Sequence, residues 1–175
     1  MTDILVVQDL YTKTPVTAIP GARIITSVQE LTAAQQVITN YFGIGVLPAG
    51  HKLVSAVIEC DDMDSAVLHT LSVGILNTYY GQAPATAAVP AAYAPATGDS
   101  YSATNTGTAP ALVSGQNIFT SSTVPQAGGR VYPSLAFTDA IGVDYNRDRI
   151  IACYFPTVGT AVTGTLTLIY GIDAA

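Results

Sequence analysis

The sequence has no tryptophan, two lysines and two cysteines, and charged residues make up only 10% of its 175 positions. A typical soluble domain carries about 25% charged residues. With so few charges, much of the surface must be uncharged, and large surfaces of that kind usually mark a protein that lies against partners. The length is that of one domain with a substantial buried core.

The shortage of basic residues argues against nucleic acid as a partner. Six lysines and arginines leave a formal net charge of −6, and just Arg147 and Arg149 sit close together, whereas phosphate binding needs clustered positive charge. No apolar run approaches the roughly 18 residues of a membrane span. Asp3 stands where a signal peptide would carry positive charge, which predicts no secretion signal. Two cysteines in an unsecreted chain are more often free buried thiols than a disulfide. Cys60 and Cys153 are therefore predicted to be free.

The abundant residues indicate β-structure. Thr, Val and ten Tyr suit pleated, half-buried surfaces, and 15 Gly and 10 Pro supply turns. Period-two alternation predicts strands over 51–59, 68–76, 148–155 and 163–172. The predicted inward residues are Lys52, Val54, Ala56 and Ile58 in the first strand, Leu71, Val73 and Ile75 in the second, and Leu166, Leu168, Tyr170 and Ile172 in the last. Thr70, Ser72 and Gly74 are expected to face outward. This pattern predicts an all-β single domain, a β-sandwich or jelly roll.

The N-terminal segment is predicted as an extended arm over 1–27, followed by the sandwich domain over 28–175. A short strand is expected at 4–7, and Pro15 and Pro20 exclude a helix or a central strand after it. A second strand is indicated at 22–28. The capping-box form Ser27-Val28-Gln29-Glu30 favours a short helix or turn to about residue 35 and then a strand, although a strand over 35–47 fits equally.

Residues 82–111 form a low-complexity stretch with four prolines and Asp99 as the one charged residue. A loop of this length inside a compact domain is usually functional or disordered. With so little charge and so few large apolar residues, it gains little by packing on itself. We therefore expect it to dock on neighbouring subunits.

Three aspartates within four residues, Asp61, Asp62 and Asp64, follow the strand over 51–59 and invite comparison with a calcium site that would include Glu59. Calcium loops need more ligands and a glycine at the sharp turn, so a hairpin turn joining 51–59 to 68–76 is favoured. His51 and His69 lack metal-ligand spacing. No nucleophile elbow, phosphate loop or dinucleotide fingerprint occurs, which predicts no enzyme, no cofactor and no metal. The charged run over 144–149 is either an interface contact or a solvated turn.

Three sequence features together resemble a known family: LPAG leading into the alternating strand after Gly50, DDMD followed by TLSVGIL, and DRIIACYFPTVGTAVTGTLTLIYGI near the C-terminus. The chain resembles the decoration, or cement, proteins of tailed-bacteriophage heads over roughly 36–76 and 147–172. That resemblance implies a β-sandwich or jelly-roll domain, often trimeric, that binds the outside of the capsid and clamps neighbouring copies of the major capsid protein.

From this resemblance we expect a non-enzymatic virion protein, made in the host cytoplasm, whose partners are the major capsid protein and copies of itself in a homotrimer. The arm and the loop over 82–111 are the expected bridging parts. The expected interface residues are Leu5, Val6, Tyr11, Pro15, Ile19, Pro20, Tyr93, Tyr101, Arg147 and Arg149. The alternatives are a tail or connector protein and a carbohydrate- or receptor-binding β-sandwich, although the absence of tryptophan disfavours sugar stacking.

Overall fold

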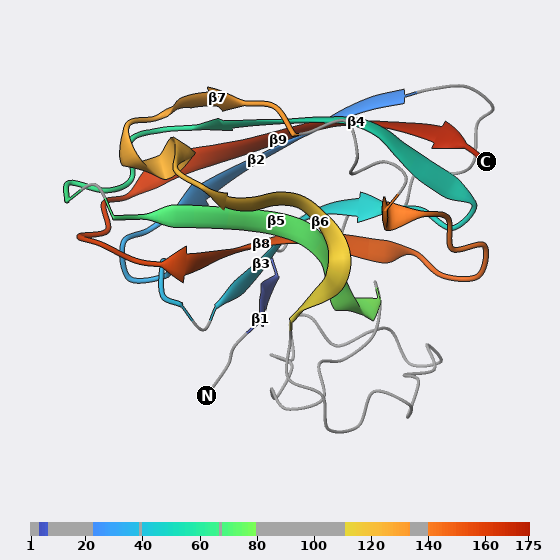
Figure 1. Ribbon diagram of the computed structural model, residues 1–175, viewed down its shortest axis with the longest axis horizontal. Coiled ribbons are helices and arrows are strands. Elements are labelled where there is room, and N and C mark those ends of the chain that lie inside the picture. The colour runs from blue at the N-terminus through green and yellow to red at the C-terminus, as the bar shows by residue number, and fades with distance from the viewer. Residues whose placement is uncertain (1–3, 7–22, 39, 67, 80–110, 134–139) are drawn as a thin grey trace.

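The computed structural model describes residues 4–6, 23–38, 40–66, 68–79, 111–133 and 140–175, and they form two β-sheets packed face to face (Figure 1). The first sheet has the strand order β1-β3-β8-β5-β6 and the second has β2-β9-β4-β7. The strands are β1 (Ile4–Val6), β2 (Arg23–Leu31), β3 (Tyr41–Leu47), β4 (His51–Cys60), β5 (Thr70–Tyr79), β6 (Leu112–Ser122), β7 (Gly129–Val131), β8 (Arg149–Thr157) and β9 (Gly164–Ala174). The predicted all-β sandwich is confirmed.

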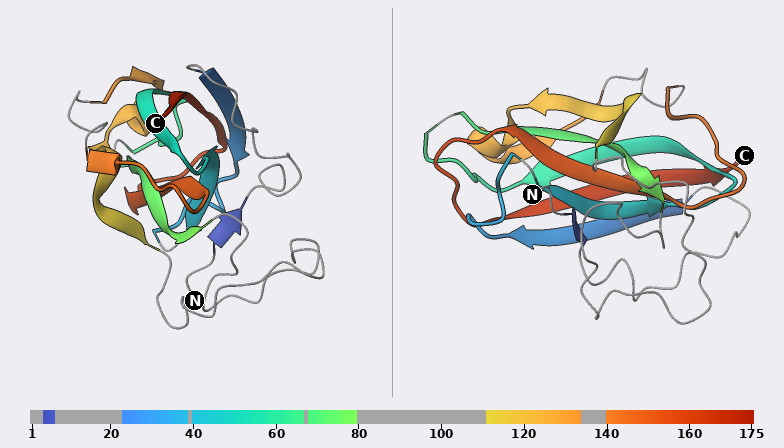
Figure 2. Two further views of the ribbon diagram at one scale, coloured as in Figure 1. Left: turned by 90° about the vertical axis from the view of Figure 1, so that its right-hand side faces the viewer. Right: turned by 90° about the horizontal axis from the view of Figure 1, so that it is seen from below.

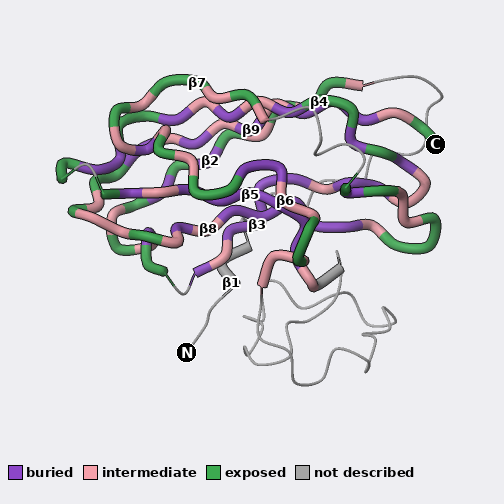
Figure 3. The backbone as a smooth tube through the Cα atoms, in the orientation of Figure 1, coloured by how far each residue is buried: buried purple, intermediate pink, exposed green. Residues whose placement is uncertain are grey.

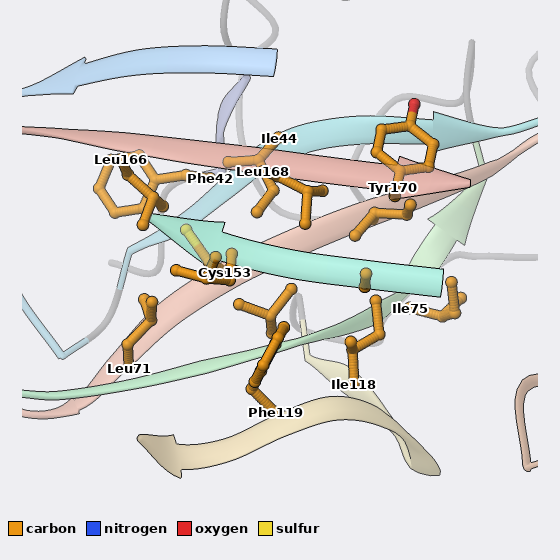
Figure 4. Packing of buried hydrophobic residues seen from close by; sticks show 14 of the residues in the cluster. Phe42, Ile44, Leu71, Ile75, Ile118, Phe119, Cys153, Leu166, Leu168 and Tyr170 are labelled. Atoms are coloured by element: carbon orange, nitrogen blue, oxygen red, sulfur yellow. The ribbon is translucent and has the colours of Figure 1, made fainter. Parts of the chain in front are cut away.

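β9 is the central strand of the four-stranded sheet and follows its predicted alternation. Leu166, Leu168, Tyr170 and Ile172 are buried between the sheets. Thr165, Thr167 and Ile169 alternate with them and are half-buried on the outer side. β9 pairs antiparallel with β2 on one side and β4 on the other. Its apolar face therefore supplies much of the core shown in Figure 4.

The inward face of β4 differs from the prediction in its first half. Ala56 and Ile58 are buried as expected, but Lys52 and Val54 are exposed, and Leu53 is buried instead. The cause is a register shift against β9 between Leu53 and Ser55, where β4 carries one extra residue. Because side chains alternate with period two, one inserted residue moves every side chain before it to the opposite face.

β5 is buried on both faces, although Ser72 and Gly74 were expected to point outward. The edge strand β6 curls closely over it: the Ser121 amide donates to Ser72 Oγ at 2.9 Å. A Cβ atom added at Gly74 would lie 2.8 Å from the Gln116 carbonyl oxygen. Glycine is therefore required at position 74 for β6 to approach, and sequence alternation alone could not reveal this contact.

The helix or turn predicted from Val28 onward does not begin there. Val28 lies inside β2, whose nine residues all pair with β9 without a register shift. The turn follows at Thr32–Gln35, where the Gln35 side chain accepts from both the Thr32 amide and its hydroxyl. A capping box contributes about 1 kcal/mol, which a nine-residue ladder outweighs. The predicted arm boundary at residue 27 therefore falls inside β2, and residues 7–22 lie outside the described ranges.

The connection from β4 to β5 is not the predicted hairpin. β4 belongs to the four-stranded sheet and β5 to the five-stranded sheet, so residues 61–69 carry the chain from one layer to the other. Figure 2 shows the two layers end-on and from below. The acidic segment therefore connects the two sheets, which a hairpin turn within one sheet would not do.

The core lies between the sheets, and a smaller buried cluster lies on the other face of the five-stranded sheet. Along β8, Ile151, Cys153 and Phe155 face the core, while Ile150 and Ala152 belong to the second cluster with Leu76. Figure 3 shows the resulting continuous buried stretch through β8 and β5. The strand predicted at 148–155 is confirmed, but it is buried on both faces, which the alternation did not predict.

Candidate interaction surface

The acidic segment after β4 is organised around Asp64, which is only 2% exposed. Its carboxylate accepts backbone N–H groups from Ala66 at 2.9 Å, Leu68 at 2.5 Å, His69 at 2.6 Å and Thr160 at 3.0 Å. Burial raises the pKa of Asp64, but the backbone hydrogen bonds and the nearby His69 outweigh that effect and hold it below its ordinary value. The carboxylate therefore fixes the crossing between sheets.

Asp61 and Asp62 are exposed and also bond backbone amides. Asp61 Oδ2 accepts from Thr165 N at 2.8 Å, and Asp62 Oδ1 accepts from Asp64 N at 3.3 Å. These are the roles that aspartates take in turns. Within the described ranges, no group of three or more His, Cys, Asp or Glu side chains is arranged to hold a metal ion.

Both histidines are buried: His51 begins β4, and His69 directly precedes β5. His51 places Nδ1 3.0 Å from the Ala49 carbonyl oxygen. His69 is fully buried against Phe155, with ring centroids 4.6 Å apart, and neither of its ring nitrogens has a hydrogen-bond partner among the described residues. Burial lowers the pKa of His69, and the Asp64 charge offsets part of that effect. Both histidines serve the fold.

Both cysteines are free and buried, as predicted. The Cys60 thiol contacts the Met63 sulfur at 3.2 Å. Burial, and then the charges of Asp61 and Asp62, raise the pKa of Cys60 to about 12, and burial raises the pKa of Cys153 further. A thiol with so high a pKa is a poor nucleophile because the thiolate is the reactive form.

The charged run over 144–149 forms a turn beside the Pro48–Gly50 bend. Asp144 Oδ1 accepts from the Asn146 and Arg147 amides, and Asp148 accepts from Ala49 N at 2.8 Å. Tyr145 is 68% exposed beside a cleft of about 600 Å³. The cleft is lined by residues of β5, β6 and the segment 140–146.

Arg149 differs from its predicted place in an interface. It is buried, and its guanidinium group donates to the carbonyl oxygens of Ile141 at 2.8 Å and Gly142 at 3.0 Å. Its side chain therefore secures the segment before β8. Arg147 is exposed, so its interface role stays a prediction.

The other predicted interface residues fall mostly outside the described part of the chain. Leu5 and Val6 lie in β1, which pairs in parallel with Phe42 and Gly43 of β3. The remaining ones are outside the described ranges: Tyr11, Pro15, Ile19, Pro20, Tyr93 and Tyr101. The whole loop over 82–110 is outside those ranges too.

A surface that the sequence reasoning missed lies on the outer side of the four-stranded sheet along β2. Ile24 is 78% exposed and Val28 is 60% exposed. They pair across to Gly171 and Thr167 of β9, so they share one face with the half-buried Ile169. The sequence predicted a strand over 22–28, but the helical reading of Val28 onward concealed that Ile24 and Val28 lie on one outer face of a longer strand.

No described helix is both long and apolar enough to cross a membrane. The two-layer arrangement defines the chain as a β-sandwich. It is similar to a chain in the structure titled "Capsid of Ralstonia phage GP4", with a TM-score of 0.68, 17% identity and 99% of both chains covered. It is also similar to a chain in "Cyanophage Pam1 capsid asymmetric unit", with a TM-score of 0.54, 15% identity, 94% of this chain and 99% of that chain covered.

At these identities the likeness establishes a shared fold. No protein-family model and no curated protein matches the sequence.

Proposed function

We propose that this protein is a non-enzymatic structural component of a tailed-phage virion that decorates the outside of the capsid. The observation that carries the proposal is the end-to-end similarity to a chain of a phage capsid: 99% of each chain is covered. The two chains are therefore of about equal length, and the similarity spans the whole molecule. Two different phage capsids contain such a chain.

The described surface supports a binding role over a catalytic one. The buried titratable groups Asp64, His69 and Cys60 are engaged in backbone bonds, ring packing and sulfur contact. The charge content of 10% leaves an uncharged exterior, and Ile24 and Val28 expose large apolar side chains on one face. A protein that works by contact needs such surface and no reactive group.

Stabilisation of a shell follows from mass action. A protein that binds the assembled shell, and not its broken form, shifts the equilibrium toward the shell. A copy that bridges two major capsid subunits, and joins two further copies in a homotrimer, gains from the high effective concentration of the later contacts. The proposed bridging parts are the N-terminal segment, the loop over 82–111 and the exposed Arg147.

The test is to add purified protein to heads of the source phage that lack it, and to measure co-sedimentation and the temperature of head rupture. Saturable binding with a raised rupture temperature supports decoration. Arg147→Ala is expected to weaken saturation without changing the fold, and Arg130→Ala serves as the control at an exposed arginine beside the opposite end of β4. Absence of binding to heads, with binding to tails or glycans instead, would overturn the proposal.

A further inference from the structure

The four edge strands of the sandwich differ in how they are protected. Edge strands expose unpaired backbone groups that attract other strands, and proteins usually blunt them with short length, bulges, lysine or proline. β1 and β7 have three residues each. β6 has several register shifts against β5, and Gly115 and Ser121 adopt positive φ. β2 has none of these features: its nine residues run without a shift against β9.

Among the described residues, β2 also has no hydrogen-bonded neighbour on its outer side. Within the described ranges it pairs with β9 alone, and Figure 2 shows it at the margin of the sandwich. Its sequence, RIITSVQEL, contains no proline and no lysine. Ile24 and Val28 stand exposed on its outer face with Thr26 between them. An open, regular edge with apolar side chains is a template for strand addition.

We propose that β2 pairs antiparallel with β2 of a second copy of this chain, with the two-fold axis at Thr26. In this register Ile24 of each copy lies opposite Val28 of the other, and the two Thr26 side chains face each other. Threonine pairs are favourable directly across an antiparallel ladder, and each Ile24–Val28 pair buries apolar surface. Both apolar side chains of each strand are thereby covered by their counterparts.

The charges of β2 favour the antiparallel direction. Arg23 begins the strand and Glu30 lies near its end. In the antiparallel register Arg23 lies opposite Gln29, next to Glu30 of the other copy, whereas in-register parallel pairing would place the two Arg23 residues, and the two Glu30 residues, opposite each other. The occupant that fits this edge on both pattern and charge is therefore β2 itself.

The contact is expected to be weak in dilute solution. Seven paired residues at about 3.3 Å each span roughly 23 Å of edge. A contact along one strand edge of that length buries much less surface than the about 800 Å² per partner of a stable interface. It would become effective where many copies are held close together. Since the two-fold contact uses only β2, it can join copies that belong to different trimers, and it does not depend on the proposed capsid role.

Disulfide trapping tests the contact on the isolated full-length protein. Cys60 and Cys153 are buried, so a cysteine introduced on β2 is the accessible thiol among the described residues. Across an antiparallel pair the Cβ atoms lie about 4.5–5.5 Å apart, near the separation a disulfide needs. Under mild oxidation at high protein concentration, Thr26→Cys is expected to yield a covalent dimer on denaturing gels. An equimolar mixture of Ile24→Cys and Val28→Cys is expected to yield a mixed dimer.

The controls distinguish cross-linking in this register from cross-linking by random collision of two molecules. Glu30→Cys is exposed on the same face, but in this register it does not meet its own copy, so it stays monomeric. Adding Val28→Lys to Thr26→Cys should abolish the dimer because two lysines then flank the axis. Adding Val54→Lys, at an exposed site on β4, should leave the dimer intact. A monomeric Thr26→Cys protein, or equal cross-linking of Glu30→Cys and Thr26→Cys, would overturn the proposal.

Discussion

The hydroxyl group of Tyr170 in β9 bonds both backbone polar groups of Val46 in β3: it donates to the carbonyl oxygen at 2.9 Å and accepts from the amide at 3.1 Å. Because β9 and β3 belong to different sheets, this side chain joins the two layers through the core (Figure 4). Burial raises the pKa of Tyr170 to about 12, although the hydrogen bond to Val46 lowers it somewhat.

Removing this hydroxyl should destabilise the sandwich. Tyr170→Phe keeps the ring but leaves the amide and carbonyl of Val46 without their partner, which costs about 1–3 kcal/mol. Urea unfolding followed by circular dichroism should show a lower midpoint with an unchanged slope. Tyr145→Phe, at a hydroxyl on a 68% exposed side chain, should leave the midpoint unchanged. Equal midpoints for Tyr170→Phe and the wild type would show that water replaces the hydroxyl.

Gly45 makes room for the same ring. A Cβ atom added there would lie 3.1 Å from a ring carbon of Tyr170, which is tighter than ordinary contact. Gly45→Ala should therefore displace the ring from Val46 and cost about 1–3 kcal/mol, as overpacked cores do. The midpoint of urea unfolding measures it, with Ser114→Ala at an exposed strand position as control. An unaltered midpoint would mean that the ring shifts without losing its bonds.

The Asp64 carboxylate should matter far more than its acidic neighbours. Asp64→Asn replaces one acceptor oxygen by an amide group, whose hydrogens would face the backbone N–H donors of Leu68 and His69. We expect a clearly lower melting temperature by calorimetry. Asp62→Asn changes the same charge at an exposed site and should melt close to the wild type. Similar losses in both variants would point to net charge as the cause.

Acid should weaken the fold through His69. Its pKa is lowered in the folded protein, so the unfolded chain binds the proton more readily. Stability is therefore retained above about pH 6.5 and falls below it, with a slope of up to about 1.4 kcal/mol per pH unit until the folded pKa is reached. Asp64, whose pKa is also lowered, adds a second loss at lower pH. Urea unfolding across pH 5–8 should show the first slope, and His69→Gln should lack it.

The sequence predicted the sandwich and the faces of β9 because a central strand with one buried face shows clean alternation. It failed where a contact between strands overrides the local pattern. The inserted residue in β4 and the close approach of β6 to Gly74 depend on partners far along the chain. The surface of β2 was missed for the same reason: the ladder with β9 outweighs the helical signal after Ser27.

The acidic segment was predicted to be a hairpin turn, but in the structure it carries the chain from one sheet to the other. Asp64 is buried because β4 and β5 lie in different sheets, a topological fact that adjacent alternating strands do not reveal. Arg149 likewise seemed suited to an interface by residue type, and its carbonyl partners Ile141 and Gly142 explain why it is buried.

The segment over 80–110 should be removable without unfolding the sandwich. Its flanks are held together: the Asn77 amide donates to the Ala111 carbonyl at 2.9 Å, and the Ala111 amide donates to the Asn77 side chain at 3.2 Å. A short glycine-serine linker can therefore close the gap, and the entropic cost of closing a shorter loop is smaller. The shortened protein should melt near the wild-type temperature but bind phage heads more weakly, since this segment is a proposed bridging part. Loss of cooperative melting would place the segment in the core, and undiminished head binding would exclude it from the contact.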